Sequence, residues 1–320
     1  MMHEQSFADR LIENVKSKQS RVVVGLDTNF DEIPNFIKLE KSQRLGYTLE
    51  ALCATIIDFN KRIIDAVVDN VIAIKPQIAY YEQYGHLGIR AFEETLDYAK
   101  KKQLLVISDA KRNDIGETTR AYSSGHIGKV KYWNDSTISS FDSDAITVNP
   151  YLGSDGILPF VEDAKLFRKG VFVLVRTSNP SAGEIQDLRT NSKRIYQVVA
   201  ELVNRWNEGT EGAYGYGCVG AVVGATYPKE ASLLRKLMPH VLFLVPGYGA
   251  QGATANDVVS CFNEGGLGAI VNSSRGIIFS YKKSPWSQKY TEEKFDDAAR
   301  AASLDMKNSI NSALKESNLL

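Results

Sequence analysis

The sequence predicts an α/β protein that folds as a single (β/α)8 barrel, the TIM barrel. Eight short apolar runs rich in Val and Ile follow one another along the 320 residues, and helical patterns separate most of them. Near-continuous apolar runs are typical of parallel strands that are buried on both faces. The count of eight favours a closed barrel over the alternative, a doubly wound open sheet. The runs are Val22–Asp27, Val71–Pro76, Leu104–Asp109, Ala145–Pro150, Val171–Arg176, Cys218–Gly224, Val241–Pro246 and Gly268–Asn272.

An amphipathic segment precedes the first run. Phe7, Leu11 and Val15 recur at helical spacing, and Ser6 with Asp9 resembles a capping box. We therefore expect a helix over residues 6–18 that plugs the bottom of the barrel.

Helical periodicity predicts the other helices, including a last one at the C-terminal end. The connections 28–47 and 179–217 are longer than a minimal barrel needs, so we expect them to form lids or rim structures. Because no internal repeat or low-complexity tract interrupts the pattern, residues 1–320 are expected to form one domain with the first and last helices packed on the barrel. The further helices are expected at residues 49–68, 89–101, 195–206, 228–237 and 292–314.

The composition excludes several classes of protein. The 38 basic and 38 acidic residues give zero net charge, which gives no support for a nucleic-acid or membrane partner. Three distant cysteines without C-x-x-C spacing and four scattered histidines argue against a disulfide framework or a metal site. The first twenty residues carry many charges and no apolar core, and no run approaches the length of a transmembrane helix. These observations predict a cytoplasmic protein.

Charged residues gather at the ends of the predicted strands. The third run, in the stretch LLVISDAKRNDIGET, ends in Asp109 and Lys111, and Asp114 follows just beyond. Residues two apart on a strand share a face, so Asp109 and Lys111 project together, and the same parity brings Asp27 and Lys75 to the mouth of the barrel. An alternating array of carboxylates and ammonium groups would keep each group ionised.

Each of these features has a simpler interpretation when it is taken alone. The pattern D-x-K-x-x-D by itself is more typical of a structural ion pair, Lys75 of a snorkelling side chain, and Asp27 of a helix cap. Their coincidence at successive strand ends favours a functional site. The same selection by position adds Asn149, Ser178, Gln251 and Arg275.

The last two strands carry a second pattern. Residues 246–252, PGYGAQG, form a glycine-rich loop whose backbone can approach an anion closely. Arg275, in SSRG, follows the eighth strand and has a guanidinium suited to bidentate phosphate binding. Loops after strands seven and eight are a frequent phosphate site in this fold, so we expect one here.

Seven short segments at the ends of the predicted strands follow one another along the chain: GLD at 25–27, IKPQ at 74–77, DAKRNDIGET at 109–118, TVNPYLG at 147–153, RTSNP at 176–180, PGYGAQG at 246–252 and NSSRG at 272–276. On these segments the chain resembles the orotidine 5′-monophosphate decarboxylase family, and the resemblance extends strand by strand over most of its length. The resemblance implies a carboxy-lyase of pyrimidine biosynthesis that converts orotidine 5′-monophosphate to uridine 5′-monophosphate with no metal and no organic cofactor. It also implies a homodimer with its active sites at the interface.

The resemblance also implies roles for individual residues. Lys111 would donate the proton to C6 of the pyrimidine, and Asp109, Lys75 and Asp114 would complete the charged array. Asp114 and Thr118 would be lent by the neighbouring subunit, which fits their place beyond the strand end.

The remaining roles concern substrate binding. Asp27, like Lys75, would hold ribose hydroxyls, and Ser178 would contact the pyrimidine. Gln251 and Arg275 would grip the phosphate. Two further residues, Gln77 and Asn149, match secondary positions of the family pattern.

Two other functions compete with this one. A sugar-phosphate decarboxylase or epimerase can share D-x-K-x-x-D, but it uses magnesium to stabilise an enediolate; Lys75 and Ser178 argue against it. A non-catalytic nucleotide-binding barrel is the second alternative. The intact set with Lys111 argues against that one, because a binding protein has no need of a proton donor.

Overall fold

The barrel that the sequence predicts is confirmed. The computed structural model describes residues 5–320, so His3 and the start of the charged N-terminal segment lie outside the described residues. Eight parallel strands close in the order β1-β12-β11-β10-β7-β6-β3-β2, and each overlaps one predicted run. The strands are β1 (Val22–Leu26), β2 (Ala73–Pro76), β3 (Leu105–Arg112), β6 (Ala145–Val148), β7 (Gly170–Arg176), β10 (Val219–Val223), β11 (Phe243–Val245) and β12 (Ala269–Ser273).

Helices surround the barrel, and six of them match the predicted ones: α1 (Phe7–Lys18), α3 (Leu49–Val67), α5 (Gly85–Lys101), α9 (Ile195–Asn207), α10 (Pro228–Leu237) and α13 (Phe295–Glu316). The structure adds elements that the periodicity did not predict. The added helices are α2 (Asn35–Leu45), α4 (Ala79–Glu82), α6 (Gly116–His126), α7 (Leu158–Phe167), α8 (Gly183–Gln186), α11 (Ala255–Val258) and α12 (Arg275–Ile278). Two small hairpins pair β4 (Val130–Lys131) with β5 (Thr137–Ile138) and β8 (Arg189–Thr190) with β9 (Lys193–Arg194). None of the helices in residues 5–320 combines the length and the apolar character that crossing a membrane requires.

Strand residues alternate between two apolar cores. Val23, Ala73 and Ile107 belong to the cluster inside the barrel. Their neighbours Val24 and Ile74 belong to the larger cluster between strands and helices. The parity expected for β1, β2 and β3 is therefore confirmed, and it directs the side chains two and four residues further along toward the mouth.

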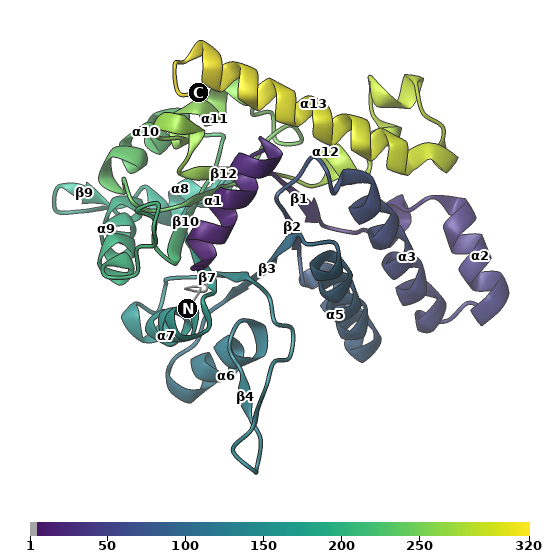
Figure 1. Cartoon of the computed structure of the whole chain (residues 1–320), viewed down its shortest axis with the longest axis horizontal. Helices are drawn as coiled ribbons and strands as arrows, with labels where there is room; N and C mark the ends of the chain where they lie inside the picture. The colour runs from purple at the N-terminus through teal and green to yellow at the C-terminus, as the bar shows by residue number, and fades with distance from the viewer. Residues whose placement is uncertain (1–4) are drawn as a thin grey trace.

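Helix α1 closes the other end of the barrel, as Figure 1 shows in purple. Its Phe7 packs edge to face on Phe172 of β7, with ring centroids 6.0 Å apart. A Cβ atom on Gly170 would lie 2.3 Å from the Phe7 ring, so only glycine permits this approach. The helix begins at the predicted cap, where the Asp9 amide donates to Ser6 Oγ at 3.1 Å.

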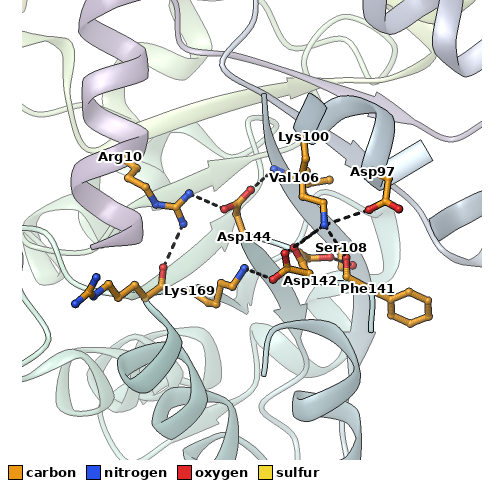
Figure 2. Close-up of polar contacts among 11 residues, drawn as sticks. Arg10, Asp97, Lys100, Val106, Ser108, Phe141, Asp142, Asp144 and Lys169 are labelled. Atoms are coloured by element: carbon orange, nitrogen blue, oxygen red, sulfur yellow. Dashed lines mark hydrogen bonds and ion pairs between the residues drawn. The ribbon is translucent and has the colours of Figure 1, made fainter. Parts of the chain in front are cut away.

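A polar network ties α1 to the strands beneath it (Figure 2). Arg10 donates to Asp144 Oδ1 at 2.7 Å, and Asp144 Oδ2 accepts from the Val106 amide of β3 at 2.9 Å. Beside them Asp142 accepts from Lys169 at 2.8 Å and from Lys100 at 3.3 Å. Opposite charges are paired in this network, and the pairs hold α1 against the strands at the end of the barrel opposite the open one.

A buried histidine anchors α6, the helix that carries Thr118. His126 Nδ1 lies 3.1 Å from Ser108 Oγ on β3, and Ser108 Oγ lies 2.8 Å from Ser143 Oγ. Burial, with a smaller contribution from the charge of Arg112, lowers the pKa of His126 to about 3. The imidazole is therefore neutral in the folded protein at physiological pH.

The lowered pKa of His126 predicts that the free energy of unfolding decreases at acidic pH. The unfolded chain protonates His126 near pH 6.5 and the folded chain only near pH 3, so stability is lost as the pH falls between these values. The loss from pH 7 to pH 5 is expected to be about 2 kcal/mol larger for the unmodified protein than for His126→Gln. Urea unfolding at the two pH values measures this loss of unfolding free energy. The control is His86→Gln, which replaces an exposed histidine. Equal losses in all three proteins would contradict the prediction.

Candidate active site

A carboxylate held between two ammonium groups forms the centre of the open end. Asp109 Oδ1 accepts from Lys111 Nζ at 2.6 Å, and Asp109 Oδ2 accepts from Lys75 Nζ. Lys75 and Asp109 are buried, whereas the Lys111 side chain is 45% exposed. Lys111 is therefore the most accessible of these three groups to a ligand in the cavity.

Mutual attraction keeps the buried pair charged. Burial alone would raise the pKa of Asp109, but the ammonium groups of Lys75 and Lys111 outweigh it and hold that pKa far below its ordinary value. Burial alone would lower the pKa of Lys75, but the carboxylates of Asp109 and Asp27 raise it above its ordinary value. Lys75 and Asp109, the buried pair at the centre of the predicted array, are thus ionised at neutral pH.

Thr147 of β6 fixes this array from the side. Its Oγ1 accepts from the amides of Ala110 and Lys111, each at 3.0 Å, and donates to Asp109 Oδ1 at 2.9 Å. Lys111 has a left-handed backbone conformation with φ of 47°, which for a residue with a side chain must be held in place by its surroundings. The hydroxyl of Thr147 supplies that support, and it also orients the carboxylate of Asp109.

Two buried acceptor oxygens belong to cavity-lining side chains on neighbouring strands. Asp27 Oδ1, after β1, and Asn272 Oδ1, on β12, have no hydrogen-bond partner within residues 5–320. Both side chains line the cavity. Buried acceptors are normally satisfied, so these two call for donors from a ligand, such as hydroxyl groups.

The glycine-rich loop and Arg275 lie together, as expected. Gly247, Gly249 and Gly252 all have positive φ, between 72° and 105°, a region that residues with a Cβ rarely occupy. The resulting tight turn places Gln251 at the cavity, and Arg275 reaches the cavity from the first residue of α12. An amide and a guanidinium at this rim suit an anionic group of a ligand.

The end of β7 forms the wall across from β1. Ser178 lies here against Gly224, where an added Cβ would approach the Ser178 backbone to 3.0 Å. Gln186 of α8 folds back onto this strand end and accepts from the Thr177 amide at 3.0 Å. This part of the 179–217 connection therefore forms the rim of the site.

Most predicted site residues meet in one cavity of about 490 Å³. Three predicted residues do not line it within this chain: Asp114, Thr118 and Asn149. Asn149 instead accepts from the Tyr151 amide at 3.1 Å, and Thr118 is exposed on α6. The predicted residues that do line the cavity are Asp27, Lys75, Gln77, Asp109, Lys111, Ser178, Gln251 and Arg275.

The cavity also has polar lining residues for which no role was predicted: Thr147, Thr177, Asn179, Gln186, Asn272 and Ser274. Five of these lie inside segments quoted above for the family resemblance, and inward parity at the strand ends could have selected Thr147 and Asn272. Gln186 carried no such pattern. Among residues 5–320, no three His, Cys, Asp or Glu side chains gather in a way that could hold a metal ion.

Comparison with known proteins places the chain in a family. The profile described as "Orotidine 5'-phosphate decarboxylase / HUMPS family" matches residues 20–290. A protein of Caldicellulosiruptor saccharolyticus named orotidine 5′-phosphate decarboxylase is 42% identical over 309 residues, which cover 97% of this chain and 99% of that protein. The chain belongs to this family.

Other members of the orotidine 5′-phosphate decarboxylase family agree with it in sequence and in fold. The protein of that name from Rhodopirellula baltica is 43% identical over 301 residues, 94% of this chain and 97% of its own length. The solved structure of Leishmania donovani OMP decarboxylase has a TM-score of 0.71 at 29% identity, covering 96% of this chain and 98% of that one. The family that the seven segments predicted is thus confirmed.

Proposed function

We propose that this chain decarboxylates orotidine 5′-monophosphate to uridine 5′-monophosphate in de novo pyrimidine biosynthesis, and that Lys111 protonates C6 without a metal or organic cofactor. The observation that carries the proposal is the array in which Lys111 and Lys75 flank the buried carboxylate of Asp109. Membership of the family supports the reaction, and the array supports the mechanism.

The reaction needs a cation beside the reacting carbon. Loss of carbon dioxide from C6 leaves a carbanion in the plane of the ring, with no adjacent carbonyl to accept the charge. A fixed ammonium group there stabilises the developing charge and then supplies the proton. Lys111 suits this role because Asp109 and Thr147 position it at the cavity while its side chain stays partly exposed.

Asp109 has a second part in this mechanism. A substrate carboxylate placed next to the buried Asp109 carboxylate would be repelled, which raises the energy of the bound substrate and favours departure of carbon dioxide. Lys75, bonded to Asp109 on the far side, keeps the site from carrying excess negative charge. The chain's own residues thereby destabilise the reactant and stabilise the carbanion.

The remote groups of the substrate would bind at the other cavity walls. Asp27, with its unpartnered Oδ1, suits the ribose hydroxyls, and Lys75 lies beside it. Gln251 and Arg275 suit the phosphate, and Ser178 suits the pyrimidine. Phosphate binding far from C6 helps to organise the site, so substrates without phosphate should lose turnover as well as affinity.

We further propose a homodimer in which each subunit lends Asp114 and Thr118 to its neighbour's cavity. Neither residue lines the cavity of its own chain. Ile115, next to Asp114 in the sequence, is 54% exposed, and Tyr151, beyond the end of β6, is 78% exposed. Apolar side chains exposed next to a segment that needs a partner are typical of a subunit interface.

The remaining proposals concern organisation and location. We propose that the chain is a single domain and acts in the cytoplasm. Its three cysteines are buried and unpaired in the described structure, which is typical of proteins from reducing compartments.

An absorbance assay separates this function from its two rivals. Orotidine 5′-monophosphate is added to the protein with and without EDTA, and the ultraviolet change is followed. Turnover that EDTA leaves unchanged is expected. Activity that EDTA abolishes would favour the magnesium-dependent sugar-phosphate enzyme, and tight binding of uridine 5′-monophosphate without any turnover would favour the nucleotide-binding barrel.

A further inference from the structure

Gln186 has an amide orientation that the structure determines. Its Oε1 accepts from the Thr177 amide at 3.0 Å and from Arg176 Nη1 at 3.4 Å, and its Nε2 donates to Thr177 Oγ1 at 2.7 Å. A guanidinium and a backbone amide can only donate, so the oxygen of Gln186 must face them. The opposite orientation would place an N–H group against two donors.

The hydroxyl group of Thr177 continues this series of directed hydrogen bonds along the rim. Thr177 Oγ1 uses its hydrogen to donate to Asn179 Oδ1 at 2.6 Å. Oε1 of Gln186 is saturated by two donors, whereas its Nε2 has a second N–H for which residues 5–320 supply no hydrogen-bond partner. Gln186 lines the cavity, so this wall offers a donor to a ligand.

Arg176 holds this arrangement rigid. The Arg176 side chain is buried, its Nη2 donates to Asp187 Oδ2 at 3.1 Å, and its guanidinium lies 4.0 Å from the centre of the Tyr227 ring. Asp187 Oδ1 also accepts from Arg194 at 2.9 Å. The C-terminal end of α8 is therefore held against the end of β7, and Gln186 presents a preorganised donor.

The strand order indicates which ligand atom meets this donor. Among the eight strands, β7 stands four places from β1 in either direction around the barrel. A ribose bound by Asp27 at the end of β1 directs the base across the cavity toward β7. In a pyrimidine nucleotide, C4 is the ring atom opposite the ribose-bearing N1, so the C4 carbonyl oxygen points to that wall.

We propose that Gln186 is a specificity-determining residue whose free N–H donates to the C4 carbonyl oxygen of the pyrimidine nucleotide. The assignment rests on the proposed function and deepens it, since it names the group by which the site distinguishes a 4-carbonyl from a 4-amino pyrimidine. Arg176 acts through Gln186 and is a positioning residue.

The test compares two nucleotides that differ at C4. Inhibition constants of uridine 5′-monophosphate and cytidine 5′-monophosphate are measured for the unmodified protein and for Gln186→Glu. The new carboxylate can still accept from the Thr177 amide and from Arg176, but it loses the donation to Thr177 Oγ1 and turns an acceptor toward C4. Uridine 5′-monophosphate is expected to bind about 100-fold more weakly, while the affinity for cytidine 5′-monophosphate is retained or improved, so the ratio of the two constants shifts by about 100-fold or more.

Two further variants keep the result interpretable. Gln186→Met removes the donor without adding an acceptor and is expected to reduce the preference for the 4-carbonyl by about tenfold. Gln43→Glu, the same charge change on the exposed face of α2, should leave both constants unchanged. Equal weakening of both nucleotides in the Gln186 variants, or no change in their ratio, would overturn the assignment. Failure of the unmodified protein to turn over orotidine 5′-monophosphate would instead overturn the proposed function.

Discussion

Replacing Lys111 by alanine is expected to lower kcat by about 10⁴-fold or more, because one side chain supplies both the charge beside C6 and the proton. The loss should fall on kcat rather than on binding. Lys111 contacts Asp109 at one corner of the cavity, whereas the phosphate and ribose groups bind at other walls. Steady-state kinetics with orotidine 5′-monophosphate and the affinity for uridine 5′-monophosphate measure the two effects.

The control for this variant is Lys101→Ala, which removes an exposed lysine at the end of α5. It should have the kinetics of the unmodified protein. A Lys111→Ala protein that keeps more than about one hundredth of kcat would contradict the role of Lys111 as proton donor, since general acid catalysis alone contributes about 10²-fold or more.

Replacing Asp109 by asparagine is expected to reduce both turnover and stability. The variant leaves buried Lys75 without its closest counter-charge, and removing one partner of a buried ion pair costs about 3–5 kcal/mol of unfolding free energy. Lys111 also loses its partner at 2.6 Å, so the ammonium group is no longer held beside C6. Urea unfolding and kcat test the two effects, and Asp305→Asn on the exposed side of α13 is the control.

The pH dependence of this stability difference follows from the two pKa directions. The lowered pKa of Asp109 means that its contribution is present above about pH 4 and is lost as the pH falls below that value. The raised pKa of Lys75 means that its contribution is present below about pH 10 and is lost as the pH rises further. The unmodified protein should therefore exceed Asp109→Asn by its full margin at neutral pH. A margin that does not change from pH 3 to pH 7 would contradict the ionised pair.

Most of what the sequence could predict about the site rests on the alternation of side chains between the two faces of a strand. Inward positions at the ends of buried strands hold Asp27, Lys75, Asp109 and Lys111. The barrel brings them together because the carboxyl ends of all strands meet at one face. Lys111 itself departs from regular strand geometry with its positive φ. Its pairing with Asp109 was predictable from spacing, but its backbone support by Thr147 was not.

Helix α6 shows where hydrophobic periodicity fails. Its sequence is GETTRAYSSGH, and its buried residues are Thr119, Ser123 and His126. Hydrogen bonds replace apolar contacts on this face, as in the donation from Ser123 Oγ to Asp163 Oδ2 at 2.6 Å. A pattern of apolar residues could not have predicted this helix.

Gln186 shows a second limit of predicting site residues from the sequence. Its place in the cavity depends on Arg176, which is ten residues away in the sequence and buried between aromatic rings and Asp187. Contacts that fold a connection back on its own strand end have no sequence period. Such a residue is found only when the three-dimensional arrangement is known.

Hydrogen exchange at C6 of the product tests whether Lys111 delivers the proton to that carbon. By microscopic reversibility, the group that protonates C6 must also remove that proton from bound uridine 5′-monophosphate. In D₂O the unmodified protein is expected to replace H6 of uridine 5′-monophosphate with deuterium, as followed by proton NMR, and Lys111→Ala is expected not to do so while it still binds the nucleotide. Exchange at the same rate in both proteins would show that another group transfers the proton.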